Sequence, residues 1–267
     1  MEELLVKSKK FKNISEVFGI EQGVSLIAGP CSVESYEQME LVAQTLVKNK
    51  VRFIRGGAYK PRTSPYDFQG LGLDGLKILD DIRKKYSLIA VSEIMDPRYV
   101  EYGLQYLDVI QIGSRNMQNY SLLKEVGKTK HPVLLKRGMM SSISEFLLAA
   151  EYIVSNGNQN IIMCERGIRT FETYTRNTLD ITCIAVIKQQ TSLPVIVDVS
   201  HSLGRADLIE PILQILLKVN IDGIMIEIHP NPKESVSDCK QAISCDEFSK
   251  MLNNFQKEKL LNFDAFE

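Results

Sequence analysis

The stretch Pro132-Val-Leu-Leu-Lys-Arg-Gly138 decides the fold class. Its unbroken apolar run is typical of a strand that is buried on both faces, as in a parallel sheet. Ile224-Met-Ile-Glu227 repeats the pattern near the end of the chain, again with a charged residue directly after the apolar run. The sequence therefore predicts a buried parallel sheet whose polar side chains gather where the strands end.

Short apolar runs of this kind alternate with amphipathic segments along the whole chain. We expect strands at 24–28, 51–54, 88–91, 108–112, 132–135, 160–163, 194–197 and 223–227. We expect helices at 34–50, 74–85, 97–106, 120–126, 142–154, 177–190, 206–219 and 245–255, with Ser142 and Glu145 forming a capping box. This alternation predicts an α/β fold, a single (β/α)8 TIM barrel. An open doubly wound sheet is the alternative, but no glycine-rich phosphate loop follows the first strand.

The composition fits one globular domain. The chain has 267 residues, of which 44% are hydrophobic and 24% are charged. We expect residues 1–23 to be a short N-terminal extension and residues 24–267 to form the catalytic barrel. The formal net charge of -1 argues against nucleic acid as a partner. The longest apolar runs are too short to cross a membrane, so we expect no membrane partner either.

The five cysteines are scattered, odd in number and without a CxxC pair. This usage is typical of reduced thiols, so we expect a cytoplasmic protein. The N-terminus carries charged residues in place of the apolar centre of a signal peptide. Apart from Cys31, we expect the thiols to be structural or exposed at the surface, namely Cys164, Cys183, Cys239 and Cys245.

Six cations follow four of the predicted strands, and active sites of barrels lie at the carboxyl ends of strands. They are Arg55, Lys60, Arg62, Arg115, Lys136 and Arg166. The first three share the loop Arg55-Gly-Gly-Ala-Tyr-Lys-Pro-Arg-Thr-Ser-Pro65. Guanidinium and ammonium groups suit phosphate and carboxylate oxygens, so the set predicts a site for one or two substrates with several negative charges. The alternative is a solvated basic loop.

A second set of residues suits a metal ion: Cys31, His201, Glu227 and Asp238. A thiolate, an imidazole and two carboxylates favour a divalent transition metal over magnesium or calcium. Each residue also has a simpler explanation. Cys31 can be a small buried side chain, His201 a satisfied polar group, and the carboxylates partners of the nearby cations. Spacing along the chain does not decide between these interpretations.

The motifs at the strand ends resemble the 3-deoxy-D-arabino-heptulosonate 7-phosphate (DAHP) synthase family. They are Gly29-Pro-Cys31, Arg55–Ser64, Gln111–Asn116, Leu135–Gly138, Cys164–Arg169 and Ser200-His-Ser202. The sequence is most similar to the type I-beta branch, which is related to 3-deoxy-D-manno-octulosonate 8-phosphate synthase. The resemblance runs from about residue 24 to residue 255 and covers nearly the whole chain.

The resemblance implies an enzyme that condenses phosphoenolpyruvate, erythrose 4-phosphate and water to DAHP and phosphate. This is the first step of the shikimate pathway to the aromatic amino acids. It also implies one divalent transition metal ion (Mn, Fe, Co or Zn), which acts as a Lewis acid on the aldehyde and is held by the four residues named above. Similar proteins further suggest a homo-oligomer, a dimer or a tetramer.

The resemblance also implies roles for the cations. Arg55, Lys60, Arg115, Lys136 and Arg166 would hold phosphoenolpyruvate, whereas Arg62, Thr63 and Ser64 would hold erythrose 4-phosphate by its phosphate. Lys60 is our candidate for proton transfer, because cations crowd it in the sequence. Cys31 and His201 join it as catalytic residues through the metal ion.

The chain departs from the family pattern at Val199, where proline is usual, and at Leu203, where glycine is common. Three alternatives stay open: the octulosonate phosphate synthase acting on arabinose 5-phosphate, a relative that serves a specialised pathway, and an inactive binding or regulatory subunit. Lys60-Pro-Arg-Thr-Ser64 differs from the Lys-Ala-Asn-Arg-Thr-Ser loop of the first alternative. Because only about 23 residues precede the first strand, we expect no feedback inhibition by aromatic amino acids within this chain.

Overall fold

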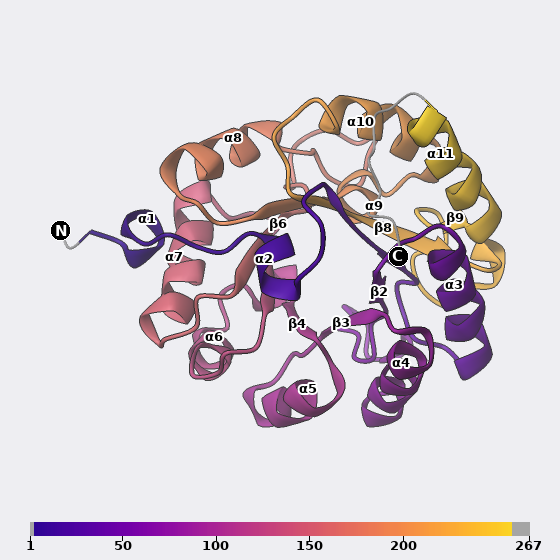
Figure 1. Cartoon of the computed structure of the whole chain (residues 1–267), viewed down its shortest axis with the longest axis horizontal. Coiled ribbons are helices and arrows are strands. Elements are labelled where there is room, and N and C mark those ends of the chain that lie inside the picture. The colour runs from indigo at the N-terminus through magenta and orange to yellow at the C-terminus, as the bar shows by residue number, and fades with distance from the viewer. Residues whose placement is uncertain (1–2, 258–267) are drawn as a thin grey trace.

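The computed structural model describes residues 3–257 and contains a closed barrel (Figure 1). Within these residues, eight parallel strands each pair with the next, and the first pairs with the eighth. The strands are β1 (Ser25–Gly29), β2 (Phe53–Arg55), β3 (Ile89–Glu93), β4 (Val109–Ile112), β5 (Val133–Lys136), β6 (Ile161–Glu165), β7 (Val195–Asp198) and β8 (Gly223–His229). The predicted single-domain (β/α)8 barrel is confirmed. A short ninth strand, β9 (Ile243–Ser244), pairs with the end of β8.

Helices surround the barrel and pack on its outer face (Figure 1). They are α3 (Tyr36–Lys48), α4 (Leu73–Tyr86), α5 (Val100–Tyr106), α6 (Tyr120–Gly127), α7 (Ile143–Ser155), α8 (Ile181–Gln190), α10 (Ile209–Leu216) and α11 (Cys245–Lys257). The capping box of Ser142 and Glu145 is confirmed at the start of α7. None of the helices within residues 3–257 has the length and apolarity needed to span a membrane.

The predicted helix 177–190 was wrong at its beginning. The helix begins at Ile181, because the Asp180 side chain accepts a hydrogen bond from the Cys183 amide and forms the N-cap. Asn177 and Thr178 instead donate their backbone N–H groups to distant carbonyls, those of Ser202 and Ile168. Two other predicted helices begin with a turn of 3-10 helix, at Pro97–Tyr99 and Ala206–Leu208.

Side chains alternate between the inside and the outside of the barrel along each strand. The inward row in the lower part of the barrel is apolar and buried: Ile27, Phe53, Val91, Val109, Leu134, Ile162, Ile196 and Met225. Two residues further along seven of the strands, the same inward row carries Arg55, Glu93, Gln111, Lys136, Cys164, Asp198 and Glu227. The period of two thus places an apolar core and a polar mouth on the same set of strands.

The first strand contributes a glycine, Gly29, to the polar row. A Cβ atom there would lie 1.9 Å from the carbonyl oxygen of Arg55. The absence of a side chain therefore lets β1 approach β2 closely at the mouth.

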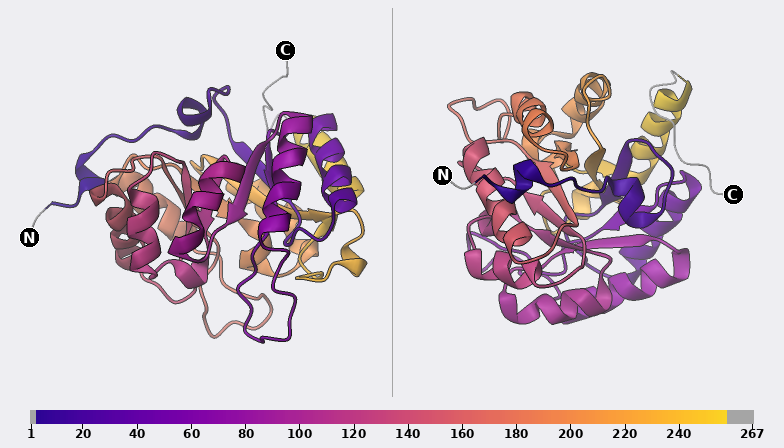
Figure 2. Two further views of the ribbon diagram at one scale, coloured as in Figure 1. Left: turned by 90° about the horizontal axis from the view of Figure 1, so that it is seen from below. Right: turned by 60° about the vertical axis from the view of Figure 1, so that its left-hand side comes forward.

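The described part of the N-terminal extension lies across the amino-terminal opening of the barrel. It contains two short helices, α1 (Leu5–Ser8) and α2 (Ile14–Phe18). Ile14 packs into the apolar barrel interior, and the Phe18 ring meets Phe53 edge-on at a centroid distance of 5.2 Å. Figure 2 (left) shows this segment on the side opposite two long loops. The boundary between extension and barrel at residues 23 and 24 stays a prediction.

Candidate active site

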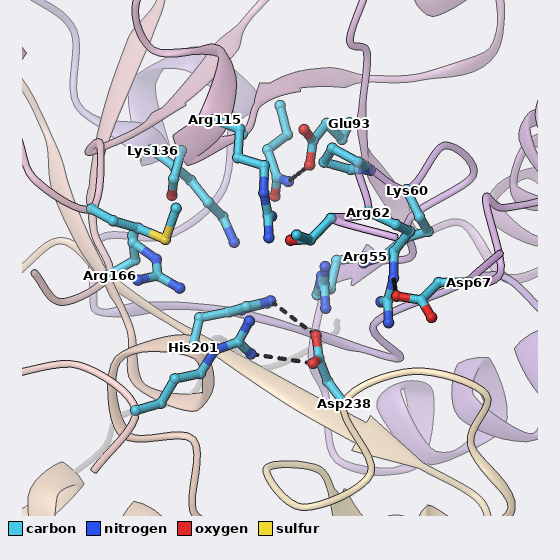
Figure 3. Close-up of a pocket in the computed structure, with 17 residues that line it drawn as sticks. Arg55, Lys60, Arg62, Asp67, Glu93, Arg115, Lys136, Arg166, His201 and Asp238 are labelled. Atoms are coloured by element: carbon cyan, nitrogen blue, oxygen red, sulfur yellow. Dashed lines mark hydrogen bonds and ion pairs between the residues drawn. The ribbon is translucent and has the colours of Figure 1, made fainter. Parts of the chain in front are cut away.

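A cavity opens at the carboxyl ends of the strands, and cations dominate its lining (Figure 3). All six predicted cations line it, together with a seventh: Arg55, Lys60, Arg62, Arg115, Lys136, Arg166 and Arg176. In Figure 3, Arg115, Lys136 and Arg166 point into this space from one side and face His201 and Asp238 on the other. The arrangement suits a ligand with several negative charges.

Two arginines of the cavity have no carboxylate partner among the residues that the structure describes. Within residues 3–257, neither Arg115 nor Arg166 forms an ion pair with a carboxylate, although Arg166 is only 3% exposed. Burial lowers the pKa of Arg166, and its side chain donates a hydrogen bond to the Gly167 carbonyl at 3.3 Å. A buried guanidinium without a counter-charge is costly, so the site is built to receive an anion.

The loop that follows β2 is held close to the barrel by its backbone. The Lys60 N–H donates to the Gln69 carbonyl, and the Gly72 N–H donates to the Ala58 carbonyl. Gly57 lies so close to Cys31 that a Cβ atom would be 2.7 Å from its carbonyl oxygen. This packing places the Lys60 ammonium 2.9 Å from the Cys31 sulfur.

Two neighbouring residues of this loop, which were predicted to bind the same substrate, differ in their surroundings. Thr63 lines the cavity, whereas Ser64 is not among the lining residues. The Ser64 hydroxyl instead accepts a hydrogen bond from the Tyr66 amide at 3.2 Å, within the loop. Arg62 lies 3.5 Å from Asp67 and also lines the cavity. The structure therefore brings Arg62 and Thr63 to the site and leaves Ser64 beside it.

The four predicted metal ligands come together at one side of the cavity. The ligand atoms of Cys31, His201, Glu227 and Asp238 all lie within 4.8 Å of one another. The Cys31 thiol donates to Asp238 at 3.1 Å, and His201 Nε2 lies 3.3 Å from a Glu227 oxygen. Residues from β8, from the short helix after β7 and from the loops after β1 and β8 thus form one cluster of soft and hard donors that suits a divalent transition metal.

Three of these side chains are also oriented by a hydrogen bond to a neighbouring group, as metal ligands in proteins commonly are. His201 Nδ1 lies 2.8 Å from Asp198 Oδ2, which leaves Nε2 turned toward the cluster. Gln241 donates to one oxygen of Glu227 at 2.6 Å, and Arg176 donates to Asp238 at 3.2 Å. The residues present therefore fit a metal ion.

Burial sets the protonation of the cluster. It raises the pKa of Cys31 to about 12, with help from the charge of Glu227. Burial also lowers the pKa of His201, although Asp198 opposes this shift. A neutral imidazole offers its lone pair, whereas the thiol keeps its proton at neutral pH until a cation takes its place.

The two departures from the family pattern leave the histidine in place. Val199 and Leu203 are the first and last residues of a short helix, α9 (Val199–Leu203), and both side chains are buried in the outer core. The Asp198 side chain accepts a hydrogen bond from the His201 amide and caps this helix. Proline is favoured at the first position of a helix, and Val199 occupies it with helical geometry. The cap therefore fixes His201.

A buried carboxyl group, that of Glu93, faces the cavity without a full set of partners. Burial raises the pKa of Glu93 in spite of the nearby Lys60 and Lys136. Its Oε1 atom has no hydrogen-bond partner in the described part of the chain, and Gln111 donates to Oε2 at 3.3 Å. A Cβ atom on Gly113 would lie 2.1 Å from Oε1, so only a glycine there leaves room for the carboxyl group. Glu93 can therefore hold or move a proton at the site.

Sequence reasoning did not identify Arg176 as a site residue. It lies in the long loop between β6 and α8, where no strand pattern leads up to it. Conversely, Arg137 follows Lys136 directly and points outward, where it pairs with Glu165 at 3.0 Å and with Asp180 at 2.7 Å. The alternation of side chains along β5 gave the signal that separates Lys136 from Arg137.

Comparison with known proteins agrees with this geometry. Residues 6–261 match the model of the DAHP synthetase I family. A phospho-2-dehydro-3-deoxyheptonate aldolase of Thermotoga maritima is 48% identical over 233 residues, which cover 87% of this chain and 69% of the relative. A 2-dehydro-3-deoxyphosphooctonate aldolase of Syntrophotalea carbinolica is 29% identical, over 88% of this chain and 90% of the relative.

Solved structures are similar over most of their length. The crystal structure of the DAHP synthase from Thermotoga maritima has a TM-score of 0.89 and 44% identity, covering 95% of this chain and 76% of that chain. A truncated form of the Thermotoga maritima enzyme has a TM-score of 0.85 and 42% identity, covering 95% of both chains. By sequence and by fold, this chain belongs to the DAHP synthetase I family.

Proposed function

We propose that this protein is a DAHP synthase. It condenses phosphoenolpyruvate with erythrose 4-phosphate and water, and it releases DAHP and inorganic phosphate as the first step of the shikimate pathway. The observation that carries the proposal is the buried Arg166, which forms no ion pair with a carboxylate of residues 3–257 and lies beside a cavity lined by six further cations. Two phosphates and one carboxylate are the charges that such a cavity can balance.

The cations have two tasks in this reaction. Arg115, Lys136 and Arg166 hold the carboxylate and phosphate of phosphoenolpyruvate, while Arg62 and Thr63 hold the phosphate of the aldose. Fixing two anions side by side overcomes their mutual repulsion and brings C3 of the enol phosphate to the aldehyde carbon. Positioning and charge neutralisation are therefore the larger part of the catalysis.

Cys31, His201, Glu227 and Asp238 hold one divalent transition metal ion, either Mn, Fe, Co or Zn. When bound, this ion supplies Lewis acidity for the aldehyde carbonyl. The protein's own groups handle protons. Glu93 is placed to accept a proton from the water that adds at C2, and Lys60 is the candidate for proton transfer near Cys31. Lys60→Met with near-normal turnover would rule out that role for Lys60.

We further propose that the protein acts in the cytoplasm and that it assembles as a homo-oligomer, a dimer or a tetramer. Its partners are the two small substrates, with no nucleic acid or membrane. Sedimentation of the purified protein measures the assembly directly, and a monomer at working concentration would contradict it.

One assay tests the proposed function against its alternatives. Consumption of phosphoenolpyruvate is followed with erythrose 4-phosphate or arabinose 5-phosphate, each before and after a chelator treatment. We expect turnover with the four-carbon sugar only, loss of turnover after chelation, and recovery when Mn²⁺ is returned. Turnover with only the five-carbon sugar would favour the octulosonate phosphate synthase, and metal binding without turnover would favour an inactive subunit.

A further inference from the structure

Every residue of the metal cluster is connected to a different cation of the substrate cavity. Arg55 lies 2.7 Å from Glu227, Lys60 lies 2.9 Å from the Cys31 sulfur, and Arg176 lies 3.2 Å from Asp238. The fourth connection is indirect, because Asp198 stands between His201 and Lys136. The metal cluster and the cations of the substrate cavity are thus joined by three direct contacts and one indirect connection.

Asp198 is the clearest of these connections. Its side chain is fully buried, and one oxygen, Oδ2, is shared by His201 Nδ1 and by the ammonium group of Lys136. Its other oxygen accepts the His201 amide at 3.0 Å. One carboxylate therefore fixes the direction of a metal ligand and supplies the counter-charge of an anion-binding lysine.

These contacts have an energetic consequence. Without a metal ion, Arg55 and Arg176 are partly neutralised by Glu227 and Asp238, and their attraction for a substrate anion is reduced. A divalent cation at the cluster competes for the same ligand atoms and takes up their negative charge. The cavity cations are then free to act on an anion, to which the metal ion adds its own attraction.

We propose that metal binding and phosphoenolpyruvate binding are thermodynamically coupled through these contacts, with Asp198 as the positioning residue that connects His201 to Lys136. The inference rests on the proposed function, because it takes phosphoenolpyruvate as the anion. Coupling of this kind is reciprocal: if the metal ion tightens the binding of the anion, the anion tightens the binding of the metal ion by the same factor.

The coupling is measured without turnover, because erythrose 4-phosphate is left out. Phosphoenolpyruvate is titrated by calorimetry into metal-free protein and into Mn²⁺-loaded protein, and Mn²⁺ is titrated with and without phosphoenolpyruvate. We expect both affinities to rise by the same factor, between about 5-fold and 150-fold. Equal affinity for phosphoenolpyruvate in the two states would overturn the inference.

Two variants separate the specific contacts from the general attraction of a nearby charge. In Asp198→Asn the link between His201 and Lys136 loses its charge, so we expect the coupling factor to fall at least twofold. Arg176→Gln, which changes a more exposed side chain, should reduce the factor as well and serves if the first variant does not fold. Arg205→Gln is the matched control, because Arg205 pairs with Asp207 outside the cavity lining.

The outcomes are distinguishable from those of the function assay. An unchanged coupling factor in both Asp198→Asn and Arg176→Gln would show that the contacts do not carry the coupling, even if the affinities themselves fall. Absence of phosphoenolpyruvate binding in either metal state would contradict the proposed function and, with it, this inference. Binding that is tight but independent of Mn²⁺ would contradict this inference alone.

Discussion

The two ends of this barrel use the same strands for opposite purposes. At the amino-terminal end, the inward side chains are apolar, and Ile14 and Phe18 of the N-terminal segment cover them. At the carboxyl end, two residues further along the same strands, most of the inward side chains are charged, and Lys136 and Asp198 are almost entirely buried there. The difference shows that the apolar end stabilises the fold. This stability offsets the free-energy cost of burying charged side chains at the carboxyl end.

The largest effect expected from the mouth is on turnover. Cys31→Ser replaces the proposed thiolate ligand with a hydroxyl that holds a transition metal poorly. We expect loss of the bound metal and loss of several kcal/mol of transition-state stabilisation, which is about a thousandfold in kcat. Metal analysis of the purified variant and the phosphoenolpyruvate assay measure the two effects, while thermal unfolding should show a folded protein.

Cys239→Ser is the matched control for this variant. Cys239 is an exposed thiol next to Asp238, but it is not part of the metal cluster. We expect this variant to keep its metal and its turnover. Equal loss in both variants would mean that the loop around Asp238, rather than the Cys31 thiolate, controls the site.

The largest effect expected from the other end is on stability. Ile14→Ala removes a side chain that is 2% exposed and packs into the lower barrel. We expect the free energy of unfolding to fall by about 3 kcal/mol, because the lost apolar burial leaves a cavity. Denaturant unfolding measures this change, and kcat and KM of the folded variant should stay the same.

A surface variant calibrates that result. Leu41→Ala changes a side chain that is 51% exposed on α3, so its effect should stay below about 0.5 kcal/mol. A drop in kcat for Ile14→Ala, at temperatures where the protein is folded, would break the division of the barrel into a stabilising end and a reacting end.

The pattern behind this division was largely readable in the sequence. The apolar runs located all eight strands within a few residues, and the polar residues after them, such as Arg55 and Glu227, occupy the mouth as expected. Strand ends are predictable because a parallel strand is covered by apolar side chains on both faces, so its first polar residues mark where the apolar core ends.

What the sequence did not reveal lies in the loops. Arg176 follows no strand. Its position beside Asp238 depends on a hydrogen bond to Gln241, a residue 65 positions further along the chain. The helix predicted from residue 177 begins only at Ile181, because backbone hydrogen bonds to Ser202 and Ile168 hold Asn177 and Thr178 outside the helix. Long-range backbone contacts of this kind leave no local pattern, so no window of sequence contains them.

A smaller effect separates two neighbours in the loop after β2. Thr63 lines the cavity, whereas the Ser64 hydroxyl is engaged within the loop. Loss of a hydrogen bond to a charged group costs about 1.5 kcal/mol, so Thr63→Val should raise the KM for erythrose 4-phosphate about tenfold. Ser64→Ala should leave this KM nearly unchanged, which initial-rate kinetics with varied aldose can measure. An equal rise of this KM in both variants would show that Ser64 contributes to substrate binding as much as Thr63 does.

The smallest effect concerns a charge that points away from the mouth. Asp180 pairs with the outward-facing Arg137. Partial burial opposes the ionisation of Asp180, but hydrogen bonds from Arg137 and Thr182 outweigh it and lower its pKa below the usual value. Because the pKa is lower in the folded protein, the pair stabilises the fold above about pH 4, and this contribution is lost as the pH falls through the folded pKa.

Measuring the free energy of unfolding between neutral and acid pH tests whether the Asp180 carboxylate contributes to stability and not to the activity of the mouth. Asp180→Asn should lower the free energy of unfolding by about 1 kcal/mol at pH 7 and should flatten its decline in acid, since the variant has no carboxylate to protonate. Asp74→Asn, which changes a side chain that is 79% exposed on α4, is the matched control and should change the free energy of unfolding at pH 7 by less than about 0.5 kcal/mol. Metal content and kcat at pH 7 should stay unchanged in both variants, because Arg137 and Asp180 lie outside the cavity lining. A loss of turnover in Asp180→Asn without a loss of stability would mean that the outward charges help to position Lys136, and the separation between outward and inward charges would then fail.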